Sequence, residues 1–184
     1  MLDTSERTLT DFGLGLAWDA RRSPEPRTEV DLRSLLDTYG LLLVRGADLD
    51  DVALVETART FGPPNIAEPI PFQSPDTPFV RVQSNVPGIG DQSAGGYWHT
   101  DGVWSDPPTA VTVLFCQEAP RTGGETLFVD MRAVHNALPA TVQDTIAGLR
   151  CLYPCREVYA ADLAKAGLSD PDRLAELKDL QHPL

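Results

Sequence analysis

The chain of 184 residues has few cysteines, few histidines and a shortage of positive charge, and each shortage excludes a class of protein. It carries 15 Lys and Arg against 27 Asp and Glu, which gives a formal net charge of −12. A surface of that sign repels phosphate backbones, so we expect no nucleic-acid partner. The three cysteines are an odd number, which argues against a disulfide scaffold. A structural zinc site normally needs two pairs of Cys or His ligands, and the sequence offers no second pair beside Cys151 and Cys155.

Long apolar runs are also missing from the sequence. No segment approaches the roughly 18 apolar residues that are needed to cross a bilayer, so we expect no membrane span. The first seven residues show no basic region followed by an apolar one, and the expected location is therefore cytoplasmic. With 42% hydrophobic residues, the length suits one globular domain over residues 1–184.

Hydrophobic periodicity and turn residues predict helices among strands near the start, a β-rich centre and helices toward the end. Helices are predicted over residues 30–39, 50–61, 131–138, 139–149 and, in one or two pieces, 156–180. Strands are predicted over residues 41–44, 79–85, 97–101, 109–117, 126–129 and from 152, and no element is predicted over 181–184. This order predicts an α+β or mainly β fold, a double-stranded β-helix (jelly roll) decorated by helices.

The strongest chemical feature is a His-x-Asp pair, His99 and Asp101, which follows a glycine-rich loop over residues 86–96. On a strand these two side chains would lie on the same face, because side chains alternate with period two. One imidazole and one carboxylate on one face are two of the three ligands of a facial-triad iron site. The pair alone is a weak motif, because a histidine hydrogen-bonded to a nearby aspartate has the same pattern.

Several motifs in colinear order strengthen the metal hypothesis. They are Tyr39 to Gly46 (YGLLLVRG), Thr60-Phe61-Gly62, Trp98-His99-Thr100-Asp101, Pro107-Pro108, the run Val111 to Phe115, Gly123 to Phe128 (GGETLF), and Val134 to Pro139. Over about residues 28–150 this combination resembles the TauD/TfdA family of Fe(II)- and 2-oxoglutarate-dependent dioxygenases, of which taurine dioxygenase is a type.

The resemblance implies a cupin-like jelly roll and an oxidoreductase that uses Fe(II), O₂ and 2-oxoglutarate. Such an enzyme hydroxylates or desaturates a small organic molecule and releases succinate and CO₂. By position, His99 and Asp101 match the first two iron ligands of the family, and both are expected to be catalytic. Thr126 matches the residue that hydrogen-bonds the 2-oxoglutarate carboxylate; an ordinary strand threonine is the alternative.

Three further residues are expected to contact the substrate. Asn85 matches a position near the mouth of the family's active site, although stabilising a turn is an equal alternative for it. Tyr97 and Trp104 flank the His-x-Asp pair and could meet a substrate larger than taurine, while core packing is the alternative for Trp104.

The sequence departs from the family in its C-terminal part. The family's second metal histidine, and the arginine that pairs with 2-oxoglutarate, lie beyond the position where this sequence stops. His182-Pro183-Leu184 resembles a step that precedes them and is not the family's ligand, and His135 falls in a predicted helix. We therefore expect a domain that is C-terminally truncated, incomplete as a barrel and, alone, poorly active, marginally stable or dependent on another chain.

Two alternatives to an active oxygenase stay open on the sequence. One is a catalytically incomplete relative, or partner-binding module, that retains the fold; the other is a zinc hydrolase that uses His99 and Asp101. A homo-oligomer or a second chain could complete the fold. The substrate, the product and the oligomeric state are not predicted.

Overall fold

The computed structural model describes residues 6–8, 15–19, 29–66, 72–90, 96–165 and 167–183. The chain divides into two compact units. Unit 1 comprises Met1–Pro64 and Leu114–Ala137, and unit 2 comprises Asn65–Val113 and Leu138–Leu184. The expectation of one domain over residues 1–184 is not tested by this division and stays a prediction.

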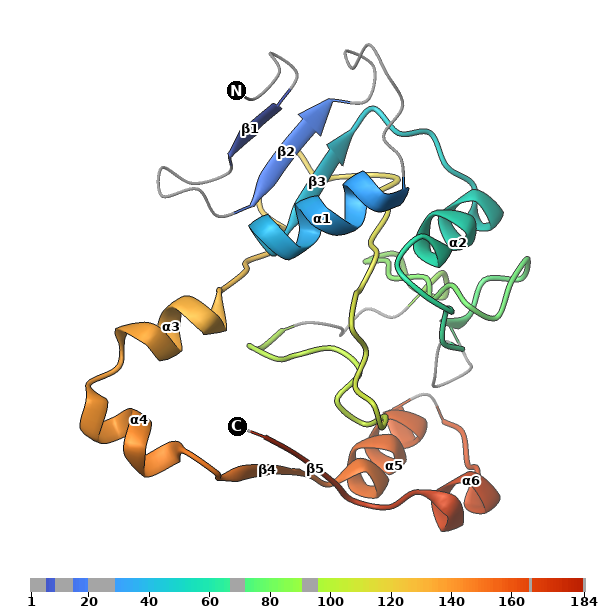
Figure 1. Cartoon of the computed structure of the whole chain (residues 1–184). Helices are drawn as coiled ribbons and strands as arrows, with labels where there is room; N and C mark the ends of the chain where they lie inside the picture. Colours follow the sequence, from blue (N-terminus) through green and yellow to red (C-terminus); the bar gives the residue numbers. More distant parts are fainter. Residues whose placement is uncertain are drawn as a thin grey trace. The chain divides into compact units, whose positions relative to one another are not determined.

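Unit 1 contains a three-stranded sheet in the order β1-β2-β3. Strands β1 (Glu6–Thr8) and β2 (Leu16–Asp19) are antiparallel, and β2 runs parallel to β3 (Leu42–Arg45), with Leu16 opposite Leu42. Parallel neighbours need a crossover connection, and helix α1 (Glu29–Tyr39) lies in the chain between them, beside the sheet (Figure 1).

Helix α1 and strand β3 confirm the elements that were predicted over 30–39 and 41–44. The helix ends where the sequence indicates, because the Gly40 amide donates to the Leu36 carbonyl at 2.7 Å. Gly40 has a φ of +70°, a left-handed conformation that favours glycine after a helix. The local signals for this part of unit 1 therefore agree with its tertiary structure.

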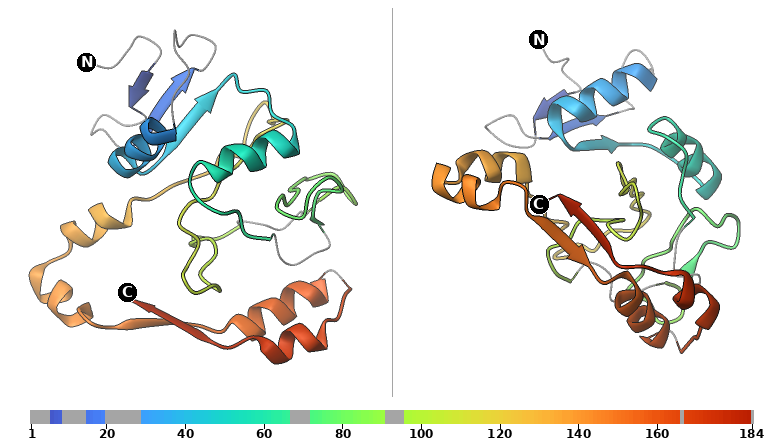
Figure 2. Two further views of the ribbon diagram at one scale, coloured as in Figure 1. Left: turned by 45° about the vertical axis from the view of Figure 1, so that its right-hand side comes forward. Right: turned by 60° about the horizontal axis from the view of Figure 1, so that its bottom comes forward.

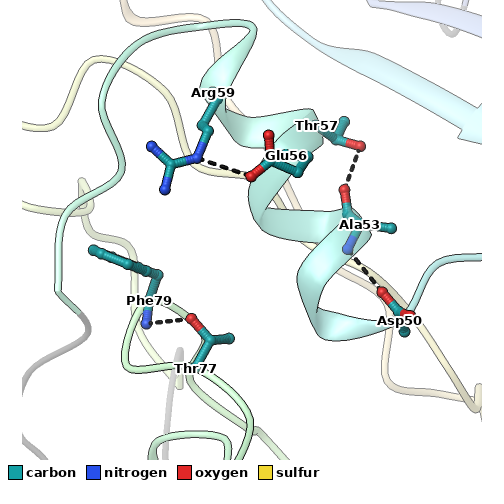
Figure 3. A network of polar contacts seen from close by, with 7 residues as sticks. All are labelled: Asp50, Ala53, Glu56, Thr57, Arg59, Thr77 and Phe79. Atoms are coloured by element: carbon teal, nitrogen blue, oxygen red, sulfur yellow. Dashed lines mark hydrogen bonds and ion pairs between the residues drawn. The ribbon is translucent and has the colours of Figure 1, made fainter.

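Helix α2 (Asp51–Arg59) begins with a side-chain cap, as the sequence predicts. The Asp50 carboxylate accepts a hydrogen bond of 2.7 Å from the Ala53 amide (Figure 3). Further along the helix, the Glu56 and Arg59 side chains pair at 3.1 Å, also drawn in Figure 3. Val55 is its buried residue, 7% exposed, so one apolar side chain and one cap anchor the helix.

Asp50→Ala is expected to lower the free energy of unfolding by about 1 kcal/mol, because the Ala53 amide loses its acceptor. Asp50→Asn keeps a side-chain oxygen at the same position and is expected to lose less than half of that. Urea unfolding followed by circular dichroism measures both variants. Equal losses in the two variants would contradict the capping role.

Helix α3 (Met131–Ala137) is capped in the same way by Asp130, whose carboxylate accepts from the Arg132 and Ala133 amides at 2.9 and 3.2 Å. The hydrogen bond from Ala133 holds the pKa of Asp130 below its ordinary value, while partial burial opposes this and Arg132 reinforces it. Because the folded-state pKa is the lower one, the cap contributes stability at neutral pH and loses it as the pH falls through that pKa.

Unit 2 contains helix α4 (Ala140–Ile146) and a two-stranded antiparallel sheet of β4 (Arg150–Tyr153) and β5 (Leu180–Pro183). Helices α5 (Cys155–Lys165) and α6 (Pro171–Glu176) connect the two strands, and Figure 2 shows the strands side by side. The helical predictions over 131–138, 139–149 and 156–180 are confirmed with shorter bounds. The expectation of no element over 181–184 is wrong for Gln181 to Pro183, since β5 includes them.

The predicted strands over 79–85, 97–101, 109–117 and 126–129 are wrong as parts of a sheet. In the part of the chain that the structure describes, the pairing near them consists of isolated bridges, at Arg81 opposite Gln73 and at Gln83. Strand propensity reports how side chains fit a pleated surface, whereas a strand also needs a hydrogen-bonded neighbour. From Val111 to Cys116 exposed residues still alternate with half-buried ones. The segment thus has the alternating exposure of a strand but no hydrogen-bonded neighbouring strand among the described residues.

Several large apolar side chains of these unpaired segments are exposed. In unit 1 Leu114, Leu127 and Phe128 are 65%, 70% and 61% exposed. Buried hydrophobic residues among those described are Ala17, Val55, Cys155 and Leu163. The described elements thus form a mixed helix and strand structure, without a jelly-roll ladder among them. No helix in the described ranges has the length and apolar character to cross a membrane.

Candidate metal site

The His-x-Asp loop, residues 96–109 of unit 2, brings the two sequence-predicted ligands together. His99 Nε2 lies 3.1 Å from Asp101 Oδ1. No strand forms over residues 97–101, so the alternation expected for a strand does not explain the contact. A turn that begins at Asp101 brings the carboxylate back toward the imidazole instead.

The second ring nitrogen of His99 is held by the backbone. His99 Nδ1 lies 2.8 Å from the Tyr97 carbonyl oxygen, which can only accept a hydrogen bond. Nδ1 must therefore carry the proton and donate it, which leaves Nε2 of the neutral imidazole with its lone pair. The Tyr97 ring also rests against the imidazole, with centroids 5.2 Å apart. This is the arrangement in which a metal-binding histidine is oriented by a carbonyl acceptor.

The lone pair on His99 Nε2 and the Asp101 carboxylate oxygen, 3.1 Å apart, repel one another unless a cation lies against both atoms. That cation is either a proton or a metal ion. Two ligands at adjacent octahedral positions, each about 2.1 Å from the ion, stand about 3 Å apart. The spacing and the donor types therefore fit a divalent metal such as Fe(II), and exposures of 38% and 48% leave both side chains accessible.

A third protein ligand is not assembled with this pair. Within the described ranges, no group of three or more His, Cys, Asp and Glu side chains is placed to hold a metal ion. His135, whose role as a ligand the sequence disfavours, lies on α3 of unit 1. His99 and Asp101 are therefore two candidate ligands, and other groups would have to fill the remaining positions of an ion.

The loop after Asp101 is closed by hydrogen bonds to one carbonyl. Gly102 O accepts from the amides of Ser105 and Thr109, both at 3.3 Å, and from Ser105 Oγ at 2.9 Å. Gly102 has a φ of +64°, and a Cβ built on it would lie 1.9 Å from Thr109 Oγ1. Asn65 Nδ2 donates to Thr109 Oγ1 at 3.4 Å. Position 102, directly after Asp101, therefore requires glycine, because the backbone is left-handed there and Thr109 leaves no room for a Cβ atom.

The remaining sequence-predicted site residues lie in both units. Asn85 is exposed in a bend where the Ser84 hydroxyl accepts from the Val86 amide at 3.0 Å, so a neighbouring side chain already stabilises that turn. Tyr97 and Trp104 of the His-x-Asp loop are 74% and 47% exposed, and the second value argues against core packing for Trp104. Thr126 is exposed in unit 1. The roles of these four residues stay predictions.

Two contacts of the loop were not predicted from the sequence. They are the Tyr97 carbonyl that holds His99 and a hydrogen bond between His182 and the Val103 carbonyl. Both acceptors are backbone oxygens, and every residue has one, so no residue type marks them.

Comparisons with known proteins agree with these features. The family model described as taurine catabolism dioxygenase TauD, TfdA family matches residues 10–180. An alpha-ketoglutarate-dependent 2,4-dichlorophenoxyacetate dioxygenase of Cupriavidus pinatubonensis is 29% identical over 138 residues, which cover 67% of this chain and 48% of that protein. A protein of the same name from a Burkholderia species is 25% identical over 134 residues, 65% of this chain and 45% of its own. The chain thus spans about half the length of these relatives.

Proposed function

Because this chain belongs to the TauD/TfdA family, we propose that it serves an Fe(II)- and 2-oxoglutarate-dependent dioxygenase reaction on a small organic molecule. Membership of this family implies 2-oxoglutarate, also called alpha-ketoglutarate, as co-substrate and Fe(II) as cofactor. The proposed reaction consumes O₂, oxidises a C–H bond by hydroxylation or desaturation, and releases succinate and CO₂.

The approach of His99 Nε2 to Asp101 Oδ1 is the observation that carries this proposal. The Tyr97 carbonyl keeps the proton on Nδ1, so Nε2 offers its electron pair to a metal. The Asp101 carboxylate supplies negative charge and an oxygen ligand on the same side. Bound by these two groups, Fe(II) would supply the redox chemistry with O₂, while the protein holds and orients the reactants.

The other predicted contacts complete the proposal. Thr126 would donate a hydrogen bond to a carboxylate of 2-oxoglutarate, while Asn85, Tyr97 and Trp104 would meet the substrate. The exposed rings of Tyr97 and Trp104 support an organic substrate with apolar surface, because such rings gain from covering it. Two relatives are named for an aromatic substrate, 2,4-dichlorophenoxyacetate, which is consistent with this class.

We also propose the jelly roll, in one domain, as the fold of this protein. The alternation from Val111 to Cys116 and the exposed apolar side chains of Leu127 and Phe128 support it, because a paired strand would cover one such face. The unpaired segments would then be strands of that fold.

The proposal is tested by anaerobic titration of the 184-residue protein with Fe(II) and then 2-oxoglutarate. We expect a visible metal-to-ligand charge-transfer band that saturates at one equivalent of each. Replacing Fe(II) by Zn(II), which has a filled d shell, is expected to give no band. The variant His135→Ala should retain the band, since His135 lies on α3 outside the His-x-Asp loop.

A folded protein that gives no band would contradict the proposal for this polypeptide. That result would favour the alternative function, a catalytically incomplete relative that keeps the family's sequence pattern and binds a partner.

A further inference from the structure

The C-terminal strand of unit 2 touches the His-x-Asp loop through one side chain. His182 Nε2 lies 2.8 Å from the Val103 carbonyl oxygen, 79 positions away in the chain. A carbonyl oxygen only accepts, so His182 donates, and it can do so both as the Nε2-protonated neutral ring and as imidazolium. Val103 follows Asp101 by two residues. The contact therefore joins β5 to the segment that carries the two candidate metal ligands.

His182 is itself oriented by the sheet that carries it. It stands opposite Cys151 in the β4–β5 pair, and half-buried residues alternate with exposed ones along both strands. Cys151, Tyr153 and His182 all belong to the half-buried set. The rings of Tyr153 and His182 lie 5.4 Å apart at a tilt of 46°. A hydrogen bond with Cys151 raises the pKa of Tyr153, so at neutral pH this neighbouring ring is uncharged.

The loop has few other described anchors. Its aromatic side chains Tyr97, Trp98 and Trp104 are 74%, 65% and 47% exposed, so they contribute little packing. Its internal hydrogen bonds, three of them to Gly102 O, one to Tyr97 O and one to Pro107 O, close the loop on itself and do not attach it to a strand. Among the described residues, a hydrogen bond from Asn65 to Thr109 joins the loop to a neighbouring segment, and it is long at 3.4 Å. The shorter bond from His182 is thus the better-formed attachment to a regular element.

We infer that His182 is a positioning residue for the His-x-Asp loop. Through its hydrogen bond to Val103 O, His182 holds the backbone after Asp101, and so limits how far the carboxylate can move from His99 Nε2. The inference rests on the proposed metal site for its functional meaning, while the contact itself exists without metal. His182 acts in this proposal as a hydrogen-bond donor to the loop and not as a metal ligand.

The test compares three replacements of His182. Glutamine reaches with an N–H donor to about the position of Nε2, asparagine carries the same amide on a shorter side chain, and leucine has no donor. The first readout is hydrogen exchange of the Ser105 and Thr109 amides in the metal-free protein. We expect exchange at least about fivefold faster in His182→Leu and His182→Asn, because a net hydrogen bond of about 1 kcal/mol is lost. His182→Gln should stay near the wild type.

The second readout is Fe(II) affinity measured anaerobically. We expect His182→Leu to lower the Fe(II) affinity about tenfold and His182→Gln to restore it. A loss of this size is typical when a group that orients a metal ligand is removed. Exchange of the α5 amides, which also belong to unit 2, controls for unfolding of that unit in each variant. If His182→Leu does not fold, the comparison of Gln with Asn carries the test.

The outcomes separate the two proposals. Unchanged Ser105 and Thr109 exchange in a folded His182→Leu or His182→Asn variant would overturn the positioning role, whatever the metal does. Faster exchange with unchanged Fe(II) affinity would also overturn it, because the contact would then order the loop without affecting the ligands. If the wild type itself fails to bind Fe(II), the metal proposal fails, and the exchange comparison still decides whether His182 holds the loop.

Discussion

His99→Ala is expected to weaken Fe(II) binding by at least about a hundredfold. Removing a group that hydrogen-bonds to a metal ligand typically lowers metal affinity by about ten- to a hundredfold, and removing the ligand itself should cost more. Nε2 is the atom freed for a metal by the hydrogen bond from Nδ1 to Tyr97 O, and alanine supplies no replacement. Asp101→Ala is expected to have a similar effect, since it removes the carboxylate 3.1 Å away. Anaerobic titration calorimetry with Fe(II) measures both affinities.

A matched control is available in the same chain. His135→Ala removes the same side chain from α3 and is expected to leave the Fe(II) affinity within about twofold of the wild type. Asp101→Asn separates charge from shape, because the amide oxygen can still face a metal but carries no charge. Its affinity should lie between those of the wild type and Asp101→Ala. Fe(II) binding that survives in His99→Ala would place the metal elsewhere and contradict the site.

Gly102→Ala is expected to destabilise unit 2 by about 2–5 kcal/mol. A left-handed φ of +64° costs a side-chain-bearing residue about 1–2 kcal/mol. The new Cβ would also lie 1.9 Å from Thr109 Oγ1 and 2.3 Å from Thr109 Cβ, and such overpacking costs about 1–3 kcal/mol more. Because Gly102 O closes the loop, relaxation of this clash would also displace Asp101. Urea unfolding measures the stability, and Fe(II) titration of the folded fraction measures the displacement.

Gly88→Ala separates the two costs. Gly88 has a similar φ of +81°, but its Cβ would meet nothing within 4 Å. We expect it to lose only the conformational part, about 1–2 kcal/mol. The double variant Gly102→Ala with Thr109→Gly removes both clashing atoms and should recover part of the loss. Equal losses in Gly88→Ala and Gly102→Ala would show that the close approach of Thr109 carries no energetic weight.

Much of the helical structure was predictable from local residues. Asp50 and Asp130 accept hydrogen bonds from the first turns of α2 and α3, and Gly40 ends α1 with a positive φ. These signals act over four residues or fewer, so neighbouring positions in the sequence contain them completely. The contact between His99 and Asp101 is equally local and was expected, but the strand from which it was expected does not form, and the role of the pair as metal ligands stays a prediction.

The central strands were predicted less well for a related reason. Residues 109–117 and 126–129 have strong strand propensity, but a strand is defined by hydrogen bonds to a neighbour, and that neighbour can lie anywhere in a chain. In the described residues that neighbour is absent, and apolar side chains such as Leu127 and Phe128 are exposed. Propensity therefore identified the extended segments and could not supply their partners.

The sequence by itself determined which residues are candidates to bind a metal, where most helices begin and end, and which family the chain resembles, since all of these depend on side-chain chemistry and short-range spacing. Only the tertiary structure decided that the Tyr97 carbonyl leaves Nε2 of His99 free for a cation, and that His182 of β5 reaches the Val103 carbonyl. Both depend on backbone oxygens that every residue carries, so their selection comes from how distant and turning segments meet in space.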